Sequence, residues 1–150
     1  MPRFVFRAEP ALDLRRRRED AARQAQAEAT ASCAAAQRAF DHATAAVNQS
    51  LAELAAQSDP ARAAWYRNWI ARQRQDAAIK KARLAERRIA LDRAVARLNL
   101  AHRDVRALER LRAKALAAWQ LAEQRAEQKE LDWLASVRYA LRENESEDRA

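Results

Sequence analysis

Apolar residues recur every seven positions through the second half of the chain. The row contains Ile70, Ala77, Leu84, Leu91, Leu98, Val105, Arg112, Trp119, Ala126 and Trp133, and only Arg112 is polar. A second row, three residues further on, contains Ala94, Ala101, Leu108, Ala115 and Ala122. Two apolar positions per heptad, held over many turns, form the seam of a left-handed coiled coil. The pattern predicts one very long helix with a narrow apolar face.

The first half of the chain shows a weaker form of the same repeat. Its main row is Leu12, Glu19, Gln26, Cys33, Phe40, Val47 and Leu54, and its companion row is Ala22, Ala29, Ala36 and Ala43. Small side chains let two helices approach closely but bury little apolar area each. We therefore expect a second helix here, with its tightest packing from about Cys33 to Leu54.

Signals that would break a helix are nearly absent. The chain has no glycine, and its prolines are Pro2, Pro10 and Pro60. Pro10 suits a first helical turn, and in Ser58-Asp59-Pro60 the aspartate can cap a helix that begins with the proline. We predict a single coiled-coil domain over residues 1–150. It has an extended lead over 1–9, a helix over about 10–57, a turn at 58–60, a helix over about 61–142 and a fraying acidic tail, 143–150.

A short turn between two long helices makes them antiparallel neighbours. The predicted fold is therefore all-α, a long two-helix antiparallel coiled-coil hairpin, in which Pro10 lies near Leu108. The second helix then continues for about thirty residues as a C-terminal helical overhang roughly 50 Å long. Uncovered apolar surface of this kind is a candidate docking site, unless the turn lies later or the chain dimerises. The overhang carries Leu111, Leu116, Trp119, Leu121, Leu131, Trp133, Leu134, Val137, Tyr139 and Leu141.

The charge balance favours an anionic partner. The formal net charge is +8, and the acidic tail leaves residues 1–142 with 28 bases and 17 acids, or +11. Such a body attracts nucleic acid, acidic lipid or an acidic protein face, although solvated arginine-rich helix faces give the same count. The bases after residue 90 take several faces of the helix, whereas a helix that reads a nucleic-acid groove concentrates them on one side. Nucleic-acid binding is therefore disfavoured, even though Trp65, Tyr66 and Trp69 lie among bases.

The sequence lacks the residue patterns of catalysis. Without glycine there is no phosphate-binding loop, and His42, His102 and Cys33 show no metal-ligand spacing. We expect no enzyme activity, no cofactor and no metal site. No stretch is apolar enough to form a transmembrane segment, the lone cysteine allows no internal disulfide, and the N-terminus lacks a signal-peptide core. These features predict a chain in the reducing cytoplasm.

Two ends of the chain resemble the flagellar FliJ family. The start, Phe4-Val5-Phe6-Arg7 through Leu12, Leu14 and Arg15 to Glu19, is similar to the family's aromatic-x-aromatic-Arg opening. The end resembles its C-terminal signature, in Val105-Arg106-Ala107-Leu108-Glu109-Arg110-Leu111-Arg112 and in Glu127-Gln128-Lys129-Glu130-Leu131-Asp132. Trp65-Tyr66 and Trp69-Ile70 resemble its central aromatic patch. The likeness spans nearly the whole chain.

The resemblance implies a component of the flagellar type III export apparatus. A FliJ protein is an antiparallel coiled coil similar to the stalk of rotary ATPases, which inserts into the export ATPase hexamer and promotes its assembly and hydrolysis. It contacts the cytoplasmic domain of the export-gate membrane protein and escorts export chaperones. This implies a cytoplasmic protein peripherally associated with the inner membrane at the flagellar base.

Two sets of contact residues follow from the resemblance and the overhang. The predicted ATPase-binding set is Phe4, Phe6, Arg7, Arg112, Trp119, Glu127, Gln128, Lys129, Leu131 and Trp133. The predicted export-gate set is Tyr66, Trp69, Ile70, Gln73 and Lys80. The sequence departs from the family at Gln73, where an apolar residue is usual, and in the unusually basic stretch from Arg72 to Arg88.

Three other functions are also compatible with the sequence. A stalk protein of virulence-type secretion shares the architecture. A basic nucleic-acid-binding coiled coil would explain the charge of the body. A self-assembling structural coiled coil would use the heptad row to pair two chains.

Overall fold

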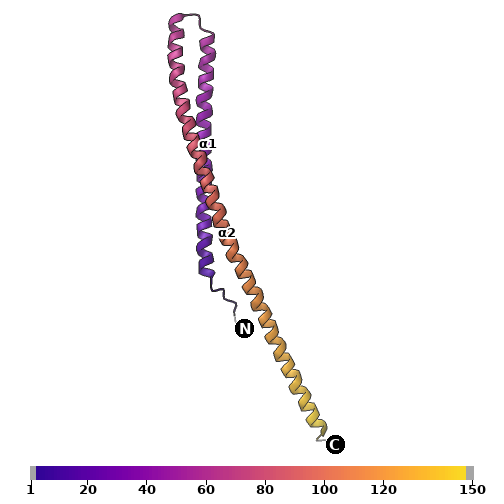
Figure 1. Ribbon diagram of the computed structural model, residues 1–150. Helices are drawn as coiled ribbons and strands as arrows, with labels where there is room; N and C mark the ends of the chain where they lie inside the picture. Colours follow the sequence, from indigo (N-terminus) through magenta and orange to yellow (C-terminus); the bar gives the residue numbers. More distant parts are fainter. Residues whose placement is uncertain (1–2, 148–150) are drawn as a thin grey trace. The chain divides into compact units, whose positions relative to one another are not determined.

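A computed structural model describes residues 3–147 and contains two helices, α1 over Glu9–Ala55 and α2 over Pro60–Glu147. Residues 56–59 connect them, and the described part of the chain has no strand. Figure 1 shows α1, from indigo to magenta, running antiparallel beside the first part of α2. The predicted all-α helical hairpin is confirmed.

The helix ends follow from capping. The Asp59 carboxylate accepts a hydrogen bond of 3.0 Å from the Ala61 backbone N–H, and the Asp59 carbonyl accepts one of 2.9 Å from Ala63. With Pro60 at the first helical position, this is the start that the sequence predicts for α2. At the other end of the turn, α1 stops at Ala55, two residues before the predicted end at Gln57.

The acidic tail is more helical than predicted. Fraying was expected from Glu143, yet α2 continues to Glu147. Glutamate and arginine are good helix formers and no glycine or proline stops the helix, so its last turns persist. The remaining tail residues, 148–150, lie outside the described residues.

The described residues pack as two units. Residues 15–104 form the hairpin unit, and residues 3–14 with 105–147 form the terminal unit. The expectation of one continuous coiled-coil domain stays a prediction.

Burial in the hairpin unit follows the heptad rows. Ile70 and Leu84 of α2 are each 3% exposed, and Ala43 and Val47 of α1 are also buried. All members of both α1 rows from Glu19 to Leu54 are buried or half-buried. The period of seven therefore locates the seam correctly, including its alanine-rich part.

Cross-helix polar pairs fix the antiparallel register of the hairpin unit. Arg15 bonds Asp104 at 2.8 Å, and the Arg88 guanidinium donates to the Gln37 side-chain oxygen at 2.8 Å. Residue numbers fall along one helix as they rise along the other, as the turn at residues 56–59 requires. In the terminal unit, Leu12 is fully buried and Val105 is 4% exposed, so one member of each main heptad row is buried there as well.

Candidate docking surfaces

An exposed aromatic patch forms on the first turns of α2 and consists of Trp65, Tyr66 and Trp69. The Trp65 and Trp69 rings stack with centroids 5.8 Å apart and an interplanar angle of 11°. Tyr66 meets Trp65 edge-on at 5.1 Å. The two tryptophans are four residues apart and therefore share one helix face. They remain 58% and 42% exposed, so the patch is preformed and open to a partner.

Tyr66 connects the aromatic patch to the end of α1. The negative charge of the Glu53 carboxylate raises the pKa of the Tyr66 hydroxyl, because it disfavours a second negative charge nearby. Loss of water around the hydroxyl and a hydrogen bond to Glu53 raise the pKa further, while Arg62 lowers it. The Glu53 carboxylate of α1 thus lies near the Tyr66 hydroxyl of α2.

The aromatic patch borders an open hollow between the two helices. Trp69, Gln73 and Lys80 line it from α2, and His42 and Ala43 are among the residues that line it from α1. The Lys80 ammonium forms an ion pair of 2.8 Å with Asp76, which also lines the hollow. The side-chain oxygen of Gln73 is buried and has no hydrogen-bond partner in the described structure. Three of the five predicted gate residues therefore surround one depression.

Ile70 takes a different place from the other predicted gate residues. At 3% exposure it is buried in the seam, next to Trp69 in the sequence. An isoleucine in that position supports the surface by packing from below. Its direct contact with a partner stays a prediction.

The N-terminal lead, residues 3–8, packs on α2 in the terminal unit. The Phe4 ring lies 5.9 Å from the Trp119 ring, and Glu9, at the start of α1, bonds Arg112 at 3.0 Å. Phe6 and Arg7 line a hollow with Phe4 and Trp119. The structure thus gathers Phe4, Phe6, Arg7, Arg112 and Trp119, which are half of the predicted ATPase-binding set.

The other half of that set lies further along α2. Glu127, Gln128, Lys129, Leu131 and Trp133 are all exposed. Trp133 follows Trp119 by fourteen residues, which corresponds to about 21 Å of helix. The sequence predicted an uncovered overhang from just after Leu108. The lead packs on Ala115 and Trp119 of α2, whereas Leu111 stays 54% exposed. The bare segment therefore begins later, because the aromatic lead finds an aromatic partner there.

The bare C-terminal segment, residues 120–144, exposes large apolar side chains. Leu131 and Trp133 are 66% and 65% exposed. The other exposed apolar residues of the segment are Leu121, Leu134, Val137, Tyr139 and Leu141. Water-exposed leucine and tryptophan at this density are typical of an interaction surface.

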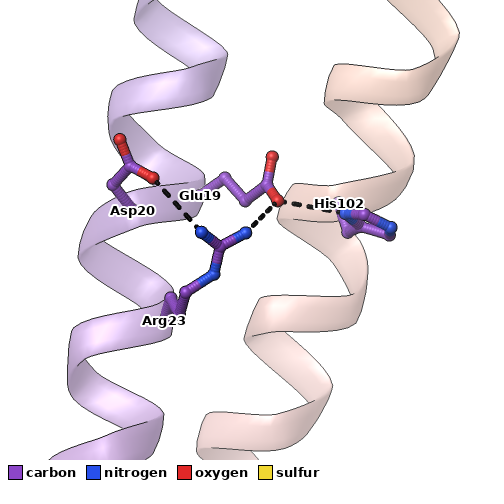
Figure 2. A network of polar contacts seen from close by, with 4 residues as sticks. All are labelled: Glu19, Asp20, Arg23 and His102. Carbon is purple, nitrogen blue, oxygen red and sulfur yellow. Dashed lines mark hydrogen bonds and ion pairs between the residues drawn. The ribbon is translucent and has the colours of Figure 1, made fainter.

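A polar layer interrupts the seam of the hairpin unit. Figure 2 shows the Glu19 carboxylate between Arg23 and His102, at 2.9 and 3.0 Å. Asp20 contacts the same guanidinium at 3.8 Å. Glu19 is a buried acid in a heptad position, and its partners satisfy it from both helices. A polar group at such a position specifies the register of a coiled coil, so this cluster is structural.

Sequence reasoning left several neighbours of the candidate surfaces unassigned. Trp65 was left out of the predicted gate set, although it stacks on Trp69, which belongs to that set. His42 of α1 shares a hollow with Asp76 of α2. The pairing of Glu9 with Arg112 could not be predicted from the sequence, because it depends on the register between the two helices.

Two other kinds of site, a metal centre and a membrane span, are absent from the described residues. Among them, no group of three or more histidine, cysteine and carboxylate side chains is placed to hold a metal ion. None of the helices there is long and apolar enough to cross a membrane. The candidate docking surfaces are the aromatic patch with its hollow, the packed lead and the bare C-terminal segment.

Comparison with known proteins gives one family. The model of the family described as "Flagellar FliJ protein" matches residues 6–144. No curated protein and no solved structure matches the chain. The match covers α1, all but the last three residues of α2, the aromatic patch and the bare C-terminal segment, and it begins within the packed lead.

Proposed function

Since the chain belongs to the flagellar FliJ family, and so is a component of the flagellar protein-export apparatus, we propose that it serves there as the coiled-coil stalk of the export ATPase. In this role the terminal unit inserts into the ATPase hexamer and promotes its assembly and hydrolysis. The observation that carries the proposal is the bare C-terminal segment, which exposes leucine and tryptophan beyond the end of the packed lead.

The ATPase contact has two parts. The packed lead offers Phe4, Phe6 and Arg7, braced by Arg112 and Trp119. The bare C-terminal segment offers the remaining five residues, Glu127, Gln128, Lys129, Leu131 and Trp133. A ring interior can bury both an apolar side chain and a charged neighbour when its own lining is mixed, so this composition suits insertion into a protein channel.

The aromatic patch is the proposed contact for the cytoplasmic domain of the export-gate protein. Tyr66 and Trp69 supply large rigid surfaces, which dominate the energy of many interfaces. Gln73 and Lys80 border the same surface and Ile70 supports it from the seam. The same face serves export chaperones in turn. The proposed location is the cytoplasm, at the inner-membrane base of the flagellum.

The ATPase contact is tested by the rate of ATP hydrolysis by the cognate export ATPase, titrated with the full chain or with a truncation that ends at Gln124. This truncation keeps the contact between Phe4 and Trp119, so it removes exposed helix and leaves the lead in place. We expect stimulation by the full chain and loss of stimulation with the truncation. Absence of stimulation by a folded full chain contradicts the stalk role.

The gate contact is tested by the affinity of the full chain for the purified cytoplasmic domain of the export-gate protein. Trp69→Ala should weaken binding by about 2 kcal/mol, as is typical of a tryptophan at the centre of an interface. Ile89→Ala is the matched control, because Ile89 is an exposed apolar residue of α2 outside the patch. Equal effects of the two substitutions would remove the patch from the gate contact.

A further inference from the structure

A groove runs along one face of the hairpin unit. Two hollows between the helices share Lys80 as a common lining residue, so they join end to end. Ser32, Ala35, Ala36, Ala39, His42, Ala43 and Ala46 line the groove from α1. Trp69, Arg72, Gln73, Asp76, Lys80, Arg83 and Arg87 line it from α2. We name this surface the hairpin groove.

The spacing of these residues gives the groove its length and direction. On each helix the lining residues follow one another at intervals of one, three or four, so they form a single stripe along the axis. On α2 the stripe runs from Trp69 to Arg87, eighteen positions that correspond to about 27 Å. The groove is therefore long enough for about eighteen residues of a third helix laid along the hairpin.

The α1 side of the groove is made of small side chains. Five of its seven lining residues are alanine, and Ser32 is of similar size. Alanine lets the axis of a neighbouring helix approach closely, so larger side chains of that neighbour can fill the space. The hairpin thus leaves room along this face that a helix with leucine-sized residues can occupy.

The α2 side of the groove is strongly basic. Four cations face one acid, Asp76, and that acid is already paired with Lys80. Within the described part of the chain, Arg83 and Arg87 have no ion-pair or hydrogen-bond partner, in contrast to Arg15, whose charge is matched by Asp104. Unmatched cations beside an apolar floor favour an occupant with carboxylates along its edge.

The end of the groove near the turn has an anchor point. Trp69 is 42% exposed there and is held by its stack on Trp65. Arg72 lies beside the same tryptophan pair. An apolar side chain at the end of the incoming helix can therefore pack on a fixed indole ring while a nearby carboxylate meets Arg72.

A nucleic acid fits the groove less well. Recognition of single strands uses aromatic side chains distributed along the strand, whereas the groove has its tryptophan at one end and alanines elsewhere. A duplex would meet the four cations only along one line and leave the alanine floor uncovered. The apolar floor with a charged edge matches an amphipathic helix lying in a groove.

We propose that the hairpin groove binds an acidic amphipathic helix of about eighteen residues from a partner protein, and so forms a local three-helix bundle. Its apolar row covers the alanine floor and Trp69, and its glutamates or aspartates meet Arg72, Arg83 and Arg87. The inference rests in part on the proposed docking function, because Trp69, Gln73 and Lys80 belong both to the proposed gate contact and to the hairpin groove. Ser32 to Ala46 and the two free arginines extend the site beyond the aromatic patch.

The test measures fluorescence anisotropy of a labelled designed peptide titrated with the full chain at about 0.15 M salt. The peptide is a helix of about eighteen residues with leucines on one face and glutamates along both edges. A second peptide has lysine at every glutamate position. We expect the acidic peptide to bind and the basic peptide to bind at least about 10-fold more weakly, given two to three charge pairs at the upper end of the range for exposed pairs.

Charge-reversed variants locate the binding. Arg83→Glu with Arg87→Glu should weaken the acidic peptide at least about 10-fold, since two attractions become repulsions. Arg74→Glu with Lys81→Glu is the matched control, because it changes the net charge equally on exposed positions of the same segment that lie outside the groove. The control should change the dissociation constant by less than about 3-fold, through long-range attraction alone.

A filled groove tests the shape independently of charge. Ala39→Trp places an indole in the path of the incoming helix and should weaken peptide binding about 10-fold or more, because the helix can no longer reach the alanine floor. Ala34→Trp is the control, since Ala34 is exposed and does not line the groove. Circular dichroism must show equal helicity for both variants.

Several outcomes would overturn the proposal. If the two charge-reversed pairs weaken peptide binding equally, the binding is long-range electrostatic attraction and not recognition by the groove. If a DNA duplex of about 20 base pairs binds more tightly than the acidic peptide, the cations bind nucleic acid. Equal effects of the two tryptophan variants would exclude the groove. If the peptide fails to bind while the export-gate domain still binds in a manner that depends on Trp69, the groove proposal is wrong and the docking function stands. Loss of export-gate binding alone removes the docking function and leaves the groove.

Discussion

The two parts of α2 carry the same sequence pattern with opposite burial. Leu84 in the hairpin unit and Trp133 in the bare C-terminal segment belong to one heptad row, and they are 3% and 65% exposed. The difference is the presence of α1 beside the first part. A heptad row therefore shows where α2 can pack against another helix. The length of α1 decides which part of α2 is covered within the chain.

The types of apolar side chain also differ between the hairpin seam and the bare C-terminal segment. The α1 side of the hairpin seam combines four alanines with Phe40, Val47 and Leu54 and with polar side chains, and few of these side chains are fully buried. The bare C-terminal segment carries leucine and tryptophan, which bury far more area each. The bare C-terminal segment thus exposes large apolar side chains where the described chain provides no cover, whereas Ile70 and Leu84 of the same helix are buried against α1.

The largest effect should come from placing a charge in the seam. Leu84→Asp buries an unpaired carboxylate and deletes a packed leucine, so the free energy of unfolding should fall by about 3 kcal/mol or more. Leu131→Asp, on an exposed position, should change it by less than about 0.5 kcal/mol. Urea denaturation followed by circular dichroism measures both. Similar losses for the two variants would mean that the C-terminal segment is covered in solution, for example by a second copy.

A smaller effect is expected where the lead meets α2. Phe4→Ala and Trp119→Ala each remove one ring of the aromatic pair, and their coupling in a double-mutant cycle should be about 1 kcal/mol. Leu121→Ala replaces Trp119→Ala in the control cycle, because Leu121 is exposed just beyond the contact. A coupling near zero for Phe4 and Trp119 would extend the bare segment back toward Leu108, as the sequence alone predicted.

Local rules predicted most of the fold. The absence of glycine, the cap at Asp59 and the period of seven gave both helices, the turn and the buried rows, since each depends on residues close in sequence. The end of α2 was placed too early because a polar, acidic composition was taken as a sign of fraying. Helix propensity of the same residues carries the helix on to Glu147.

The candidate surfaces were less predictable because they depend on contacts across the chain. The contact between Phe4 and Trp119 needs the lead to fold back on α2, and nothing in the spacing of either residue indicates it. The hairpin groove needs the alanines of α1 and the basic stripe of α2 to lie side by side, which only the register establishes. The predicted contact sets themselves came from family resemblance, and their binding roles remain proposals.

The polar layer around Glu19 should contribute little to the stability of the hairpin unit. Glu19→Ala removes the acceptor for Arg23 and His102, and because Arg23 is well exposed the loss should be only about 0.5–1 kcal/mol. Glu19→Leu fills the same position with apolar volume and should be close to neutral in stability. Chemical denaturation measures both. A loss for Glu19→Leu as large as that for Leu84→Asp would make the polar layer essential to the seam.

The smallest expected effect is the titration of Tyr66 beside Glu53. Glu53→Gln removes the negative charge that raises the Tyr66 pKa, so the pKa should fall toward its ordinary value of 10.0. Arg62→Gln should raise it further, since Arg62 lowers the pKa. Ultraviolet absorbance of tyrosinate against pH measures both in a Tyr139→Phe background, where Tyr66 is the remaining tyrosine, and Glu86→Gln is the control carboxylate.

The direction of the Tyr66 shift also fixes its link to stability. A hydroxyl whose pKa is raised by folding holds its proton more tightly in the folded state. Its contribution to the free energy of unfolding is therefore complete below the unfolded pKa of about 10. The contribution is lost as pH rises through the raised value, because the tyrosinate would then face the Glu53 carboxylate. If Glu53→Gln left the titration unchanged, Tyr66 would not be held against α1, and the aromatic patch would be free of the turn.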